Sequence, residues 1–63
     1  MNKYKITYTL NRVLRVEDKK VGVRNFEAES MEKAIDKFYI FMKGFFGARV
    51  SFKKIEIEEI TNN

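Results

Sequence analysis

The chain has 63 residues, with 13 lysine and arginine residues against nine aspartate and glutamate residues, and it contains no cysteine, histidine or proline. This length is near the lower limit for a domain that folds on its own, so we expect a single domain over residues 1–63. Without thiolate or imidazole ligands, zinc, haem and iron–sulfur sites are excluded, and the commonest general base is missing as well. We therefore expect no cofactor and no metal.

No apolar run has the length of a signal peptide or the roughly 20 residues that a membrane span requires. The polar face of the one predicted helix also mixes acids with bases, whereas a membrane-surface helix concentrates lysine and arginine there. We expect a cytoplasmic protein that does not bind membranes.

A strand is predicted at the start of the chain, over residues 4–10, because apolar and polar residues alternate there. The apolar face comprises Tyr4, Ile6, Tyr8 and Leu10. The alternation continues less cleanly as far as Val16, and the polar residues 17–20 then predict a hairpin turn.

A second strand is predicted over residues 21–28. Its apolar residues change phase between Val23 and Phe26, which indicates a bulge or a local twist. Ser30 follows this strand as a good N-cap, because its hydroxyl can accept from free N–H groups in the first turn of a helix.

The predicted helix begins after Ser30 and ends between Lys43 and Phe46, where glycines offer stop signals. Its apolar residues recur at helical spacing and predict one stripe that faces the sheet. This stripe comprises Met31, Ala34, Ile35, Phe38, Phe41, Met42 and Phe45.

A third strand is predicted from about Arg49 to Ile60, with a bulge at Lys53 and Lys54 because the apolar phase changes there. The order strand, strand, helix, strand predicts an α+β fold of the ββαβ type. A right-handed crossover gives a three-stranded sheet in the order 2-1-3, with the helix on one face.

The charge is distributed unevenly along the sequence, with a net +5 over residues 1–25 and −1 over residues 26–63. The predicted topology brings most of the basic residues to one end of the sheet, which predicts a basic pole opposite a mildly acidic one. We expect Glu56 and Glu58 to pair across strands with Lys3 and Lys5. The candidate nucleic-acid-binding residues of the basic pole are Arg12, Arg15, Lys19, Lys20, Lys43, Arg49, Lys53 and Lys54.

Concentrated positive charge attracts phosphates, and binding releases counterions. Phe46 lies in the loop at the same pole, where it could stack on an unpaired base. Ordinary solvation of a basic protein explains the lysines equally well. We expect RNA or single-stranded DNA to be the partner, because the helix that might read a duplex is needed to cover the sheet.

An exposed apolar patch is the basis of the alternative function. Tyr39 and Ile40 fall on or beside the solvent side of the predicted helix, and with Phe46 they could form a partner-binding surface. This patch, or an open strand edge, predicts a protein-interaction module that binds a host protein or forms a homodimer.

The sequence contains no pattern typical of an enzyme. Glu56, Glu58 and Glu59 belong to one alternating strand beside lysines, and no base accompanies Ser30 or Ser51. The phosphate-binding patterns GxxxxGK[ST] and GxGxxG are both absent. We expect a noncatalytic domain without a small-molecule substrate.

Residues 24–38 and 49–60 together resemble the LX family of archaeal large-subunit ribosomal proteins. The resemblance lies in the Glu27–Ala28–Glu29 entry to the helix and in the basic stretch that leads into an isoleucine–glutamate strand. It implies the same strand-strand-helix-strand order, and contact with ribosomal RNA through Arg49, Lys53 and Lys54. The bias toward lysine, asparagine and isoleucine is also similar to that of small phage or mobile-element proteins.

Overall fold

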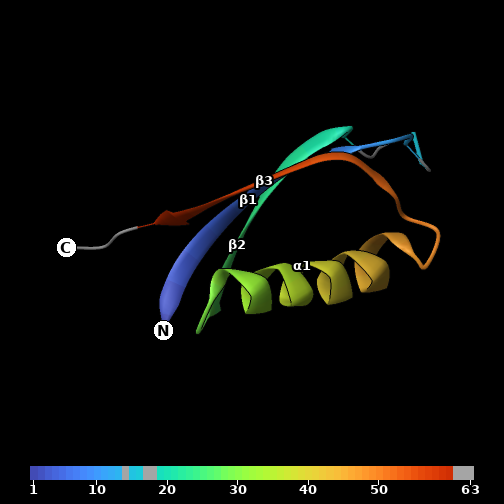
Figure 1. Cartoon of the computed structure of the whole chain (residues 1–63). Helices are drawn as coiled ribbons and strands as arrows, with labels where there is room; N and C mark the ends of the chain where they lie inside the picture. Colours follow the sequence, from blue (N-terminus) through green and yellow to red (C-terminus); the bar gives the residue numbers. More distant parts are fainter. Residues whose placement is uncertain (14, 17–18, 61–63) are drawn as a thin grey trace.

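The computed structural model describes residues 1–13, 15–16 and 19–60. Three strands and one helix follow one another as β1 (Asn2–Leu10), β2 (Val21–Ala28), α1 (Met31–Phe46) and β3 (Phe52–Ile60). The strands form one antiparallel sheet in the order β2-β1-β3, and α1 covers one of its faces (Figure 1). The predicted fold class, strand order and position of the helix are confirmed.

The central strand β1 separates the two faces of the sheet. Its side chains are alternately half-buried and buried from Tyr4 to Leu10. Alternate side chains of a strand point to opposite faces, so the buried set faces α1 and Lys3, Lys5, Thr7 and Thr9 lie on the open face. Because β1 is flanked on both sides, β2 and β3 are both edge strands.

The core lies between β1 and α1. Four residues of β1 and three of the helix are almost completely buried there, together with Ala28 at the end of β2. Full burial of one large apolar side chain contributes about 1.5–3 kcal/mol, so this short set supplies much of the stability of so small a domain. The buried residues are Tyr4, Ile6, Tyr8, Leu10, Ala28, Ala34, Phe38 and Met42.

Phe38 is the centre of this core. Its ring is fully buried, and its centroid lies 5.7 Å from that of Tyr8 and 6.2 Å from that of Phe26. The ring of Phe52 lies 5.2 Å away. One helical residue therefore contacts aromatic rings from all three strands.

Gly22 lies opposite Tyr8 in the β1–β2 register. A Cβ atom at this position would lie 2.9 Å from Cε1 of Tyr8 and still closer to its hydroxyl oxygen. The tyrosine ring therefore occupies the space that a side chain at residue 22 would need. This explains a glycine inside a strand, where it otherwise weakens the sheet.

Both ends of the helix follow the predicted signals. The Ser30 side chain accepts a hydrogen bond of 3.3 Å from the backbone N–H of Lys33. At the other end, Gly47 adopts a φ of +99°, and its N–H donates to the carbonyl of Lys43 at 2.9 Å. The helix ends at Phe46, within the predicted range.

The bulge predicted in the third strand is present. Thr9 of β1 lies opposite Lys54, whereas the next residue, Leu10, lies opposite Phe52. Lys53 is thus the extra residue, and it lets Phe52 and Ile55 both pack against the core.

One prediction about the hairpin is wrong. The strand does not continue toward Val16, because β1 ends at Leu10 and the Val16 side chain is fully exposed. The chain leaves the sheet after Leu10, and the side chains of Val13 and Val16 are both exposed. The turn predicted at residues 17–20 lies partly outside the described residues, since positions 17 and 18 are not among them.

Of the bulge or local twist predicted in β2, the bulge is absent. The register runs without interruption from Asn2 opposite Ala28 to Thr9 opposite Val21. The apparent change of phase arises because Arg24 occupies the helix-facing side, opposite Ile6, while Val23 is exposed on the open face.

Candidate nucleic-acid interface

Two backbone hydrogen bonds bring the hairpin and the start of β3 together. The N–H of Leu10 donates to the carbonyl of Lys20 at 2.8 Å, and the N–H of Asn11 donates to the carbonyl of Ser51 at 3.0 Å. The side chains of Asn11 and Ser51 form a further bond of 3.2 Å. Leu10 and Asn11 therefore hold the end of the hairpin, at Lys20, and the approach to β3, at Ser51, close to each other.

The helix ends on the same side of the molecule. After Gly47 the chain turns back through a 3.2 Å bond from the N–H of Val50 to the Gly47 carbonyl, and it then enters β3. Figure 1 shows the hairpin, the last turn of α1 and the beginning of β3 at one end, and the start of α1 at the opposite end. This arrangement agrees with the predicted pooling of basic residues.

All eight predicted nucleic-acid-binding residues are exposed. Lys54 forms an ion pair of 3.1 Å with Glu56, and the guanidinium of Arg15 lies 5.9 Å from the ring centroid of Phe45. Among the described residues, the other six form no ion pair. We call this set the basic end, and it comprises Arg12, Arg15, Lys19, Lys20, Lys43, Arg49, Lys53 and Lys54.

The opposite end carries acidic residues. Glu29 and Glu32 flank the start of α1, and Glu29 pairs with Lys33 at 2.8 Å. The molecule measures 39 Å along its longest axis, whereas charges in physiological salt are screened over about 8 Å. The acidic residues at the start of α1 therefore do not neutralise the basic end, where Glu56 pairs with Lys54.

Of the cross-strand pairs predicted on the open face, one is present. Lys5 and Glu58 face each other in the register and form an ion pair of 3.0 Å. Lys3 lies opposite Ile60 and Glu56 lies opposite Thr7. Glu56 forms an ion pair with Lys54 of its own strand instead, since its partner in the register is Thr7 and not a lysine.

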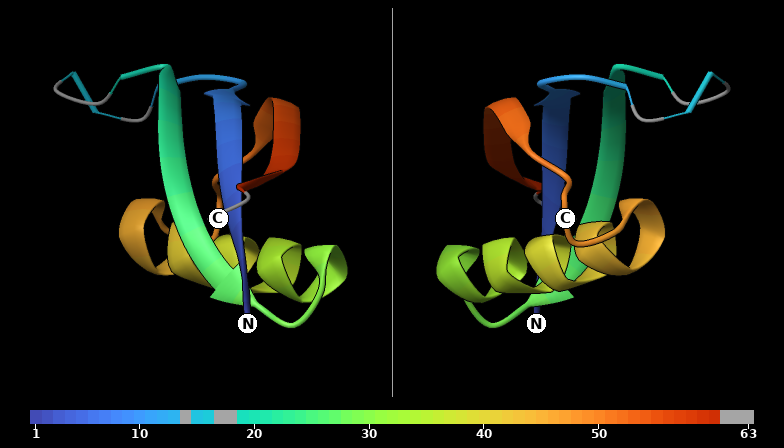
Figure 2. Two further views of the ribbon diagram at one scale, coloured as in Figure 1. Left: turned by 90° about the vertical axis from the view of Figure 1, so that its left-hand side faces the viewer. Right: turned by 90° about the vertical axis from the view of Figure 1, so that its right-hand side faces the viewer.

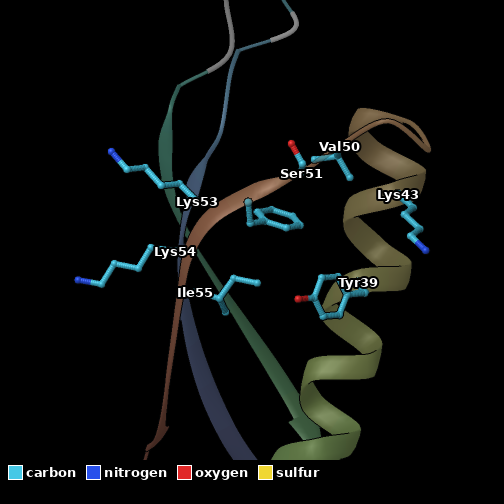
Figure 3. A pocket seen from close by; sticks show the side chains of 8 residues that line it. Tyr39, Lys43, Val50, Ser51, Lys53, Lys54 and Ile55 are labelled. Carbon is cyan, nitrogen blue, oxygen red and sulfur yellow. The ribbon is translucent and has the colours of Figure 1, made fainter.

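A groove between α1 and β3 opens at the basic end, with a volume of about 560 Å³. Its apolar surface is formed by Val50, Phe52 and Ile55, and the ring of Tyr39 forms the helical side. Figure 3 shows the Tyr39 hydroxyl directed across the groove toward β3. We call this feature the Tyr39 groove, which Ser51, Lys43, Lys53 and Lys54 complete.

The lysines of the Tyr39 groove lie on its rims. Figure 3 shows the Lys43 amine on the outer side of the helix and those of Lys53 and Lys54 on the outer side of β3. Tyr39 is 39% exposed, and its ring is supported from behind by Phe38 at 5.6 Å and Phe52 at 5.9 Å. An aromatic face between positive rims suits a ligand that combines flat apolar rings with anionic groups.

The expectations for the two phenylalanines at the helix end are reversed in the structure. Phe46, predicted to be part of an exposed patch, is half-buried against the core, with its ring 6.4 Å from that of Tyr8. Phe45, predicted to be buried, is 48% exposed. The buried residues Ala34, Phe38 and Met42 are spaced by four, so the buried face shifts around the helix from one turn to the next. This shift occurs because α1 crosses the strands obliquely (Figure 2).

The remaining members of the predicted partner-binding patch are exposed. Ile40 has 74% of its surface accessible, and Tyr39 lies beside it. Phe41 and Phe45 are also exposed, although both were assigned to the buried stripe. The exposed apolar residues of the helix therefore include Tyr39, Ile40, Phe41 and Phe45, but not Phe46.

Arg24 is the residue that the sequence analysis overlooked. It faces the helix and places its guanidinium over the rings of Phe41 and Phe45. The phase change between Val23 and Phe26 is the available signal: it predicts a bulge or a local twist, whereas it reflects a basic residue on the inner face.

Within residues 1–13, 15–16 and 19–60, no cluster of acidic side chains has the composition of a metal site. No helix in this part of the chain is long and apolar enough to cross a membrane. A comparison with known family models, curated proteins and solved structures finds no match to the chain.

Proposed function

We propose that this protein is a noncatalytic module that binds RNA or single-stranded DNA through its basic end. The observation that carries the proposal is the convergence of eight exposed cations from the hairpin, the helix end and β3 beside an accessible tyrosine ring. Cations bind the phosphates of any nucleic acid, whereas exposed aromatic rings select strands whose bases are unpaired.

A single strand suits the shape of the site better than a duplex. Helix α1 packs its inner face against the sheet, and its core residues Phe38 and Met42 are fully buried, so it is not free to enter a major groove. An unpaired base could stack on the Tyr39 ring while flanking phosphates lie near Lys43 and Lys53.

Fluorescence anisotropy with short labelled RNA and DNA strands tests the proposal. Because binding displaces counterions, affinity should fall steeply between a low and a moderate salt concentration, and a duplex of the same sequence should bind more weakly. Absence of binding at low salt would remove the proposal.

Self-association is the second candidate function, and the exposure of Ile40 favours it. Ile40, Phe41 and Phe45 present apolar surface on the outer part of the helix, and such surfaces often mark contacts with a partner. Light scattering at high protein concentration should then report a dimer that Ile40→Glu converts to a monomer. A wild-type protein that remains monomeric would exclude the homodimer.

A further inference from the structure

Arg24 is held against two aromatic rings. Its guanidinium carbon lies 5.3 Å from the ring centroid of Phe41 and 5.5 Å from that of Phe45. The two phenylalanine rings are nearly parallel, at an angle of 11° and a separation of 6.1 Å. Stacking of this kind fixes the plane of a guanidinium and leaves its in-plane N–H groups directed away from the rings.

The charge of Arg24 has no counter-ion among the described residues. Its Nε atom is buried and has no hydrogen-bond acceptor. Arg24 is half-buried as a whole, so an external anion would reach it through the terminal nitrogens of the guanidinium. A guanidinium without a counter-ion is available to form charge-assisted hydrogen bonds with such an anion.

A second groove, on the β2 side of the helix, brings Arg24 together with another cation. It has a volume of about 390 Å³ and includes Lys19 and the exposed ring of Phe45. Among the described residues, no acidic side chain lines it. The other lining residues are Tyr8, Val21, Gly22, Val23 and Phe46.

We propose that this second groove binds a phosphate group of a nucleic-acid strand, with Arg24 as the directional donor. A planar guanidinium matches two phosphate oxygens at once, and Lys19 adds a second positive charge. The exposed Phe45 ring gives the adjoining base a surface for stacking. The inference rests on the proposed function for the origin of the phosphate, since a free nucleotide would present the same group.

Nuclear magnetic resonance of the wild-type protein tests the site directly. The Nε–H resonance of Arg24 should shift on addition of inorganic phosphate, of a nucleoside 5′-monophosphate and of a short oligonucleotide, and it should not shift with sodium chloride at equal ionic strength. A stronger response to the oligonucleotide would identify the strand as the source, and a stronger response to the monophosphate would identify a free nucleotide.

The same titration separates the two proposals. An oligonucleotide that binds without moving the Arg24 resonance would overturn the phosphate site and leave the proposed function intact. A response to phosphate without any binding of oligonucleotides would support the anion site and remove the proposed function. If sodium chloride produced an equal shift, or phosphate none, the site would be overturned.

A charge-conserving substitution gives a second test. Arg24→Lys keeps the charge but loses the planar pair of donors, so the affinity for the oligonucleotide should fall about tenfold while its salt dependence stays the same. Lys3→Arg is the matched control, because it also exchanges one cation for the other and Lys3 is exposed and lies outside the basic end. Equal losses in the two variants, or no loss in Arg24→Lys, would contradict a special role for Arg24.

Discussion

The backbone N–H of Leu10 donates a 2.8 Å hydrogen bond to the carbonyl of Lys20, at the point where the hairpin leaves the sheet. The next residue, Asn11, bonds in the same way to Ser51 at the start of β3. These two bonds fix the positions of basic segments that lie more than 30 residues apart in the sequence. The charge distribution is thus a direct consequence of the strand order.

Gly22→Ala is expected to destabilise the domain. The new Cβ would overlap the ring of the buried Tyr8, and overpacking of this kind costs about 1–3 kcal/mol. The free energy of unfolding, measured by urea denaturation, should decrease by this amount. Gly44→Ala is the control: no atom lies within 4 Å of its Cβ position, and helix propensity predicts a gain of about 0.5–1 kcal/mol. Equal effects would show that the Tyr8 ring does not occupy this space.

Phe38→Ala is expected to unfold most of the protein. The ring is fully buried and contacts Tyr8, Phe26 and Phe52, and its removal costs about 3–5 kcal/mol. A domain of this size has a comparable total stability. Circular dichroism should show loss of the helix signal, whereas Ile40→Ala at an exposed position should retain it. A folded Phe38→Ala variant with unchanged thermal stability would contradict the described core.

Ser30→Ala should lower the stability by about 1 kcal/mol, because the N–H of Lys33 loses the hydroxyl that accepts its hydrogen bond. Ser30→Asp should retain the stability, since a carboxylate also caps the helix and interacts favourably with its dipole. Thermal unfolding of the three proteins measures the difference. A stable alanine variant would mean that Ser30 does not cap the helix.

Tyr39→Ala should weaken the binding of single-stranded oligonucleotides. Loss of one stacked base corresponds to about 1–3 kcal/mol, or roughly tenfold in affinity at the middle of this range. Tyr39→Phe keeps the ring and should bind like the wild type. Anisotropy titrations of the three proteins measure the effect. A phenylalanine variant as weak as the alanine variant would assign the contribution to the hydroxyl instead of the ring.

The strands and the helix could be predicted because each is encoded by a local signal. Alternation in residues 4–10 marks the central strand, Ser30 and Gly47 mark the helix ends, and the phase change at Lys53 marks the bulge. The basic end could be predicted as well, since chain direction and strand order alone place its segments together.

The details that could not be predicted depend on tertiary contacts. Arg24 faces inward because two phenylalanine rings receive its guanidinium, and no periodicity of β2 alone shows that. Phe45 and Phe46 exchange their expected environments because the contact line of α1 moves around the helix as it crosses the sheet. The same drift places Phe41 and Phe45 where they meet Arg24.

Two variants, each with four lysines replaced by glutamine, test whether nucleic-acid binding depends on the location of the lysines or only on the net charge. One replaces Lys19, Lys20, Lys53 and Lys54 with glutamine, and the other replaces Lys3, Lys5, Lys33 and Lys37; both lower the net charge from +4 to 0. Circular dichroism establishes that both remain folded. Anisotropy with a labelled single strand then measures affinity and its dependence on salt.

If the basic end is the binding surface, the first variant loses most of its affinity, and the slope of log K against log salt falls by up to about 3, since each lost phosphate contact contributes about 0.7. The second variant keeps an affinity and a slope close to those of the wild type. Equal weakening of the two variants would contradict the account, because the positive residues would then act through net charge alone.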